Sequence, residues 1–277
     1  MERREALQRI VEQAGHGEIV MPTGLDLPLR IVRALEDPDC HLDHAAHLIG
    51  SDPLIAARVV AVANSASYGR SGKAITSLRD ALSRIGLRTA RTLAMAVATR
   101  QLAGNPSSPI LRHASQTLWE HTAHVAALAH VIARRVTRQD PESALFAGIV
   151  HELGGFYLIS RANDFPGLLD GDPADWVEQA EPEIGRLLLQ RLAIPDSIVD
   201  AIESMWEGML ALPPASLGDT LLLANDLAPV PSPLYDVSSE DAAIAPVIDA
   251  LVDNGMLSAI LAESAAEVES LTAALRF

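Results

Sequence analysis

The sequence predicts an all-α protein, and three observations support this prediction. Apolar residues make up 49% of the 277 residues and aromatic residues only 4%, so the core is built mainly from aliphatic side chains that suit closely packed helices. Most segments repeat apolar residues with a period near 3.6, which is typical of amphipathic helices. Alternating β-branched stretches, which would indicate strands, are missing. The chain is long enough to bury a sizeable core, and we expect a multi-helix bundle.

The first part of the chain predicts a short helical extension, residues 1–20, followed by an N-terminal helical lobe, residues 21–105. The pattern Ser51-Asp52-Pro53 indicates an N-cap followed by proline in the first helical turn. Ser77 is a second expected N-cap, and Gly86 separates the last two helices of this lobe. The helices of the lobe are expected at 26–36, 42–49, 53–66, 78–85 and 87–103.

The segment GNPSSP, residues 104–109, is the clearest internal boundary because it combines glycine, asparagine, serine and proline. A second helical lobe, residues 106–230, begins with a long helix at about 110–137. The next helix starts at Asp140-Pro141 and carries the stretch FAGIVHELGG, and EPEIGRLLLQRLAI and PDSIVDAIESMW are two further helices. An acidic C-terminal segment, residues 231–277, predicts two more helices from Ser239 onward.

The net charge of −15 is spread unevenly along the chain. Residues 1–105 hold 13 basic against 11 acidic residues, whereas residues 106–277 hold 8 against 25. Such an acidic chain argues against a general nucleic-acid binder. The single cysteine, Cys40, excludes an internal disulfide and a cysteine-based zinc site. No signal peptide is evident and no apolar run approaches the ~18–20 residues of a membrane span, so we expect a cytoplasmic protein without a membrane partner.

The stretch FAGIVHELGG places His151 beside Glu152 in an apolar segment, an arrangement that hydrolytic metal sites often share. A zinc protease does not fit this stretch. The second histidine of the H-E-x-x-H motif is missing, and Gly154 and Gly155 stand where a ligand-bearing helix would continue.

Several motifs, in the same order along the chain, resemble the HDOD family, the HD-related output domain of bacterial signalling proteins. In the first lobe these are SDPLIAARV, ANSASYG and the spacing I-x-S-L-x-x-A-L-x-x-I-G. In the second lobe LWEHTAHVAALAHVIARR, ALFAGIVHELGG and EIGRLLLQRLAIPDSIVDAI resemble the helices that carry the HD motif of metal phosphohydrolases. The resemblance covers roughly residues 22–228. It implies an all-α fold and a role as an output or interaction module, commonly without the metal ligands.

The resemblance also indicates where metal ligands would stand in this chain. His121 matches the first-helix histidine, and His151-Glu152 matches the His-Asp pair, with its carboxylate displaced by roughly one C–C bond. The other positions are changed: Glu181 replaces the later histidine, Met205 and Trp206 replace a pair of histidines, and Asn225, beside Asp226, replaces the late aspartate.

Three interpretations of this set remain open. His151 and Glu152 can be a hydrogen-bonded polar pair inside the bundle, bonded in turn to His121. They can instead belong to a weakened metal site, or to an active phosphohydrolase. We favour the polar pair and therefore expect no catalytic residue, no bound metal and no cofactor.

A basic run between residues 58 and 100 holds eight basic residues against one acid, Asp80. Within it Arg84, Arg88 and Arg91 have the spacing of one helix face and could bind an acidic partner or a phosphate. The alternative is a solvated face that neutralises the acidic C-terminal segment. DNA is the less favoured ligand, because the net charge of the chain opposes its approach.

Two further motifs have a structural and a functional interpretation. In NSASYG, we expect Asn64, Ser65, Tyr68 and Gly69 to form a hinge between helices, with side chains that bond backbone groups at helix ends, or else to form a contact surface. In CHLDHAAH, His44 and His47 lie opposite the apolar stripe, so we expect a solvated surface in preference to a metal site.

These observations together predict a non-catalytic signal-transduction module. It would act by binding signalling proteins or a nucleotide, through the groove between its lobes and the arginine-rich face, and homodimerisation is compatible with the acidic C-terminal helices. The alternative is a divergent metal-dependent phosphohydrolase that acts on a nucleotide or a cyclic dinucleotide. A third class is a nucleotide sensor without turnover.

Overall fold

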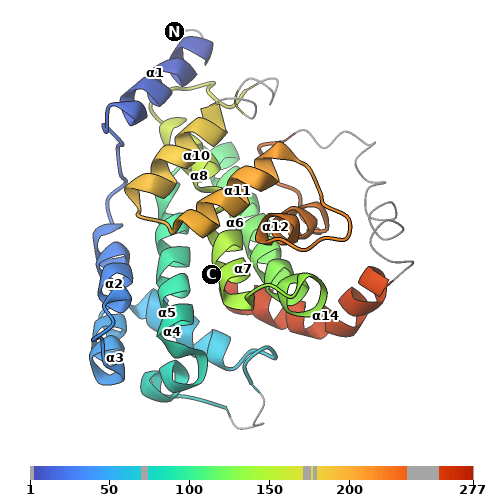
Figure 1. Ribbon diagram of the computed structural model, residues 1–277. Coiled ribbons are helices and arrows are strands. Elements are labelled where there is room, and N and C mark those ends of the chain that lie inside the picture. The colour runs from blue at the N-terminus through green and yellow to red at the C-terminus, as the bar shows by residue number, and fades with distance from the viewer. Residues whose placement is uncertain (1–2, 70–73, 171–175, 177–179, 236–255, 277) are drawn as a thin grey trace.

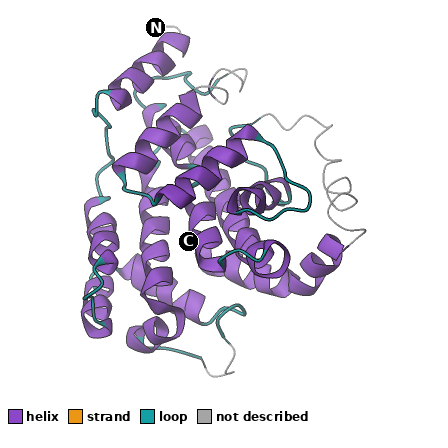
Figure 2. Ribbon diagram, in the orientation of Figure 1, coloured by secondary structure: helices purple, strands orange, loops and turns teal. Residues whose placement is uncertain are grey.

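The computed structural model describes residues 3–69, 74–170, 176, 180–235 and 256–276. All regular elements in this part of the chain are helices, as predicted (Figures 1 and 2). They are α1 (Arg3–Gly15), α2 (Asp26–Glu36), α3 (Leu42–Gly50), α4 (Pro53–Ala63), α5 (Leu78–Leu102), α6 (Pro109–Ile132), the π-helix η1 (Ala133–Thr137), α7 (Pro141–Val150), α8 (Leu153–Arg161), α10 (Ala180–Arg191), α11 (Asp196–Glu207), α12 (Leu217–Asp226) and α14 (Met256–Leu275).

The N-terminal lobe is built around α5, and its helix ends follow the predicted caps. Asp52 accepts hydrogen bonds from the backbone of Leu54 and Ile55, and Pro53 occupies the first turn of α4. Ser77 caps α5 through the backbone N–H of Asp80. Gly86 has φ 79° and ψ 166°, so it kinks α5 where the sequence predicts a separation. Beyond the kink α5 packs against α7 and α8, so this helix belongs to the cores of both lobes.

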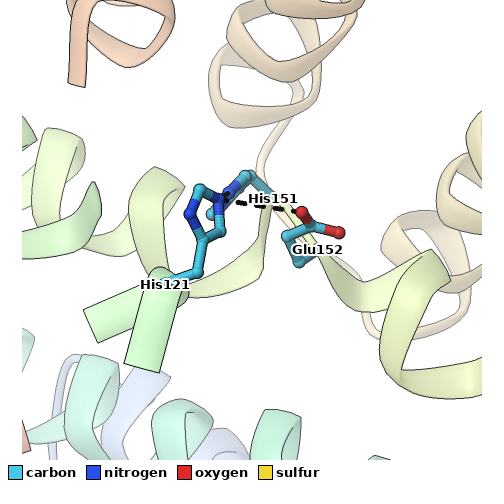
Figure 3. Close-up of side chains that lie close together, drawn as sticks. All are labelled: His121, His151 and Glu152. Carbon is cyan, nitrogen blue, oxygen red and sulfur yellow. Dashed lines mark hydrogen bonds and ion pairs between the residues drawn. The ribbon is translucent and has the colours of Figure 1, made fainter. Parts of the chain in front are cut away.

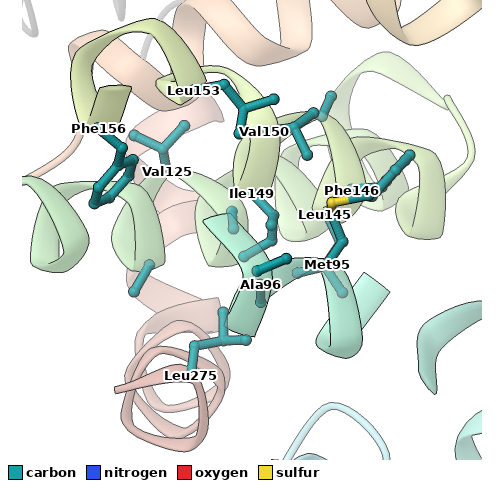
Figure 4. Close-up of a cluster of buried hydrophobic side chains, with 14 of the residues drawn as sticks. Met95, Ala96, Val125, Leu145, Phe146, Ile149, Val150, Leu153, Phe156 and Leu275 are labelled. Carbon is teal, nitrogen blue, oxygen red and sulfur yellow. The ribbon is translucent and has the colours of Figure 1, made fainter. Parts of the chain in front are cut away.

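The second lobe is centred on α6 and α7, which lie closer together than ordinary side chains allow. A Cβ atom added to Gly148 of α7 would lie 2.5 Å from Cα and 2.9 Å from the backbone nitrogen of Ala126 on α6. Around this contact, side chains such as Met95, Ile149 and Phe156 fill the core (Figure 4). The alanine-rich face of α6 thus serves to bring the two helix backbones into contact.

The structure corrects one detail of the predicted organisation and adds to two others. The stretch FAGIVHELGG does not lie within one helix, because α7 ends at Val150 and α8 begins at Leu153. The N-terminal extension forms α1, which packs on α10 of the second lobe. Of the acidic C-terminal segment the structure describes α14, and the first of its two predicted helices lies outside the described residues.

Helix α14 packs across α6 and α4 and so covers parts of both lobes (Figure 1). Arginines on the bundle bind its acidic face. Arg134 pairs with Glu267 at 2.5 Å, Arg135 pairs with Glu263 at 3.5 Å, and Ser67 donates to Glu267 at 3.0 Å. Its apolar residues Leu271 and Leu275 are fully buried. Helix α14 of the acidic segment therefore caps the bundle.

The segment Pro141–Arg161 has the length and apolar composition of a membrane-spanning helix, contrary to our expectation that no such run exists. It comprises α7 and α8, which are interrupted at His151 and Glu152, and 89% of its most apolar window is buried inside the protein. Packing in the protein core accounts for this composition.

The close approach of α6 and α7 generates a first prediction. Gly148→Ala should destabilise the protein by roughly 3 kcal/mol, because the added methyl group meets backbone atoms of α6 that cannot rotate away. Denaturant unfolding followed by circular dichroism measures this difference.

Gly15→Ala is the matched control, because its added Cβ has no atom within 4 Å. We expect a change within about 0.5 kcal/mol for this variant. Equal stability of the two variants would show that α6 and α7 are not held in contact at Gly148.

Candidate functional site

Three of the predicted ligand residues converge in the core of the second lobe. His121 comes from α6, whereas His151 and Glu152 occupy the break between α7 and α8 (Figure 3). The Nε2 atoms of the two histidines lie 3.4 Å apart, and His121 Nε2 lies 3.8 Å from Glu152 Oε1. The three side chains are between 2% and 4% exposed. The expected polar pair is thus a cluster of three residues in which His121 is the shared member.

The hydrogen bonds on the far side of each ring determine what this cluster can bind. His121 Nδ1 lies 2.8 Å from the carbonyl oxygen of Val230, and His151 Nδ1 lies 2.8 Å from that of Gly148. A carbonyl only accepts, so both Nδ1 atoms carry protons. In the neutral rings both Nε2 atoms then hold lone pairs that point at one another. A proton or a cation between them removes this repulsion.

The donor set also fits a metal ion by type and spacing. Two nitrogens bound to one tetrahedral zinc ion at ~2.0–2.1 Å lie roughly 3.4 Å apart, which matches the separation of the two Nε2 atoms. The ligand atoms of His121, His151 and Glu152 lie within 4.8 Å of one another. Glu152 Oε2 is buried and has no hydrogen-bond partner. A metal would be held by these three residues.

Glu181 extends the cluster and changes its electrostatics. Burial first, and then the Glu152 carboxylate, raise the pKa of Glu181 well above its usual value, so this side chain is a neutral acid. It hydrogen-bonds with Glu152 and Tyr235. Burial lowers the pKa of His151 to about 4, although the neighbouring Glu152 acts in the opposite direction. In the metal-free cluster, Glu181 and His151 are therefore both uncharged near neutral pH.

The two glycines of HELGG allow Glu181 to enter the cluster. A Cβ on Gly154 would lie 2.6 Å from the carbonyl oxygen of Glu181, and one on Gly155 would lie 2.9 Å from Glu152 Oε2. Larger residues at either position would separate α8 from α10. The glycines thus allow a close contact of α8 with Glu181 of α10 and with Leu234.

The chain that follows α12 covers this cluster. We call residues 230–235 the covering segment. Val230 accepts the hydrogen bond of His121, Tyr235 bonds Glu181, and Leu234 accepts a hydrogen bond from the Trp176 indole at 3.0 Å. Leu234 is itself buried, and its Cδ1 would lie 2.6 Å from a Cβ on Gly155. The contacts of the covering segment reach residues more than 50 positions away in the sequence, and such contacts leave no local signal in the sequence.

Other positions of the predicted ligand set lie outside the cluster. Asn225 is half-buried and donates a hydrogen bond to the exposed Asp226 at 3.4 Å. The Trp206 ring packs against Gly185 and lies under the Arg186 guanidinium. These residues therefore do not complete a metal site in the structure.

The three arginines predicted to share a helix face do not share one. Gly86 interrupts α5 between Arg84 and Arg88, which rotates the two parts of the helix relative to each other. Arg84 donates to the carbonyl of Ala63, Arg88 pairs with Asp140, and Arg91 pairs with Glu36 and lies over the Phe146 ring. Each guanidinium thus contacts a different helix or cap. The prediction of a common face was wrong because the helical spacing was carried across a kink.

The side chains of the NSASYG motif bond backbone groups at the end of α4 and before α5. The Asn64 amide donates to the carbonyls of Val60 and Ile75 and accepts from the N–H of Ile75, and Ser65 donates to Val62. A Cβ on Gly69 would lie 2.8 Å from the carbonyl of Ser65, which explains this glycine.

Tyr68 of the same motif connects the two lobes. Its hydroxyl donates to Glu142 at 2.5 Å, and Thr89 donates to the second oxygen of that carboxylate at 2.6 Å. Burial acts to raise the pKa of Glu142, but the contact with His130 and the hydrogen bonds from Thr89 and Tyr68 favour the charged carboxylate and lower it. In CHLDHAAH, His44 and His47 are exposed, as expected for a solvated surface.

Comparison with known proteins identifies the family. The model of the HDOD domain matches residues 21–207, which is more than half of the chain. The chain belongs to the HDOD family. Solved structures agree with this HDOD fold: a provisionally named metal-dependent phosphohydrolase from Shewanella amazonensis aligns with a TM-score of 0.74 and 20% identity over 99% of this chain and 100% of that chain.

Two other relatives are informative about the HDOD fold. An HDOD domain protein of unknown function from Geobacter sulfurreducens aligns with a TM-score of 0.65 and 24% identity over 98% of each chain. A provisionally named signal transduction protein from Marinobacter aquaeolei aligns with a TM-score of 0.65 and 20% identity over 99% of this chain and 65% of its own. An uncharacterized protein of Treponema pallidum is 24% identical in an alignment of 189 residues. The alignment covers 63% of this chain and 35% of that relative's length.

The state of Glu181 generates a second prediction. Above roughly pH 4.3 the unfolded chain releases the Glu181 proton while the folded metal-free protein retains it. This residue therefore costs stability as the pH rises, by at most ~1.4 kcal/mol per pH unit. We expect Glu181→Gln to gain stability relative to the wild type between pH 5 and pH 8, measured by denaturant unfolding at each pH.

His151 has the opposite pH dependence. Its lowered pKa means that the unfolded chain binds the proton first, so stability falls as the pH drops from the ordinary histidine value toward about 4. This contribution is common to wild type and Glu181→Gln and cancels in their difference. A stability difference that does not change with pH would contradict a protonated Glu181.

Proposed function

We propose that this HDOD protein is a non-catalytic signalling module that acts by binding other molecules. The observation that carries the proposal is the enclosure of the histidine cluster. His121, His151, Glu152 and Glu181 are each at most 4% exposed, and the covering segment bonds directly to members of the cluster. The family match and the signal-transduction relative support the signalling role.

Hydrolysis of a phosphoester at this site would need a metal that substrate and water can reach, in addition to its protein ligands. A catalytic metal supplies an activated water and keeps an open coordination position that the substrate can reach. His121 and His151 can orient a metal, but Val230, Leu234 and Tyr235 lie where access from the α12 side would be needed. Glu181, a neutral acid in place of the histidine that the family resemblance predicts, contributes no additional nitrogen ligand.

The second candidate function is a divergent phosphohydrolase acting on a nucleotide or a cyclic dinucleotide. It is favoured by the convergence of the two Nε2 lone pairs and by the unpartnered Glu152 Oε2. It requires displacement of the covering segment before substrate binds. We rank it below the binding role because the present arrangement stabilises the enclosed state through hydrogen bonds on both sides of the cluster.

Binding partners follow from the same proposal. The expected partner is a signalling protein in the cytoplasm. We also propose that the protein can bind a nucleotide and can form a homodimer. The Arg84, Arg88 and Arg91 side chains are less suited to a common anion site than their spacing indicates, because they already pair with separate elements.

A third prediction tests whether the cluster is catalytic. Protein purified without nickel resin, after growth with added iron and manganese, should hold no stoichiometric metal by elemental analysis. It should hydrolyse bis-p-nitrophenyl phosphate, nucleoside phosphates and cyclic dinucleotides no faster than His151→Ala.

His44→Ala is the matched control, because His44 is an exposed histidine that can bind metal adventitiously. About one metal per chain that is lost in His151→Ala but retained in His44→Ala, together with hydrolysis that follows the metal, would overturn the non-catalytic proposal and establish the phosphohydrolase.

A further inference from the structure

A cavity that is separate from the histidine cluster lies where the two lobes meet. Its volume is about 400 Å³, within the range of small-molecule sites. The N-terminal lobe contributes the start of α4 and the end of α5, and the second lobe contributes the start of α6. The linker GNPSSP passes between them. The lining residues are Leu54, Val97, Arg100, Gln101, Gly104, Pro106, Arg112, Ser115 and Gln116.

The charge of this cavity is opposite to that of the protein. Arg100 and Arg112 line it, and none of its lining residues is acidic, although the chain holds 36 acidic residues and a net charge of −15. Arg58 lies near Arg100, and burial together with this second positive charge lowers the pKa of Arg100. Like charges held together at a partly buried site favour binding of an anion.

Arg112 is positioned by the linker. Its Nη1 donates to the carbonyls of Pro106 at 3.2 Å and Ser107 at 2.9 Å. Both bonds use Nη1, and the planar guanidinium carries further N–H donors on Nη2 and Nε. Arginine in a fixed orientation is suited to bidentate bonds with phosphate oxygens. Ser115 and Gln116, on the next turn of α6, add neutral donors.

The remaining wall of the cavity is apolar. Leu54 is a large apolar side chain that is 48% exposed, and Val97 and Pro106 continue its surface. The cavity thus offers cations at one part and an apolar surface at another.

We propose that this cavity binds an organic phosphate of nucleoside mono- or diphosphate size. The phosphate binds Arg100 and Arg112, and the base packs on Leu54 and Pro106. An inorganic anion would use the arginines but not the apolar wall. Because Arg100 and Arg112 come from different lobes, the bound phosphate joins the lobes across their linker.

The proposal is tested by isothermal titration calorimetry of the full chain with ADP, GDP and inorganic pyrophosphate. We expect saturable binding of at least one nucleotide, weakened roughly tenfold or more in Arg112→Glu. Arg112 is exposed, so this variant should keep the fold, which circular dichroism checks. Arg79→Glu is the matched control, since Arg79 is an exposed arginine paired with Asp43 on another surface, and it should bind the nucleotide as the wild type does.

Three results would overturn the proposal. They are absence of saturable nucleotide binding at millimolar concentration, equal binding by wild type and Arg112→Glu, and pyrophosphate binding as tight as that of the nucleotides. The cavity and the histidine cluster share no residue, so each of these results is independent of whether the cluster binds metal.

Discussion

The contact between α6 and α7 determines the geometry of the second lobe and of its polar cluster. Gly148 lets the α7 backbone touch α6 at Ala126, five residues beyond His121 in the sequence. The carbonyl of the same Gly148 accepts the His151 Nδ1 proton. A single residue therefore sets both the distance between the helices and the tautomer of one histidine. The 3.4 Å separation of the two Nε2 atoms follows from this backbone contact.

Local features of the sequence predicted the fold well, because helix ends depend on neighbouring residues. Asp52, Ser77 and Asp140 each cap the helix that their position predicts. The family resemblance located His121, His151 and Glu152, and the structure brings these three together. The backbone bonds of Asn64 were also predictable, since they reach only four residues back and eleven residues forward.

Features that depend on distant contacts were not predictable in this way. The pairing of Arg91 with Glu36 spans 55 residues, and the bond of His121 to Val230 spans 109 residues. Periodicity carries no information on such pairs. The break at His151 was missed because its apolar neighbours continue the helical pattern on both sides. The cavity between Arg100 and Arg112 was likewise hidden, since the two residues belong to different predicted lobes.

The attachment of α14 has a consequence for competition at the surface that it covers. This helix lies on α6 and α4, with Leu271 and Leu275 buried. Because α14 belongs to the same chain, its binding to this surface is intramolecular and its effective concentration does not fall on dilution. A protein that binds the same surface must therefore displace an intramolecular competitor. Weak partners are excluded from this face, and its occupancy depends on the affinity and abundance of the partner.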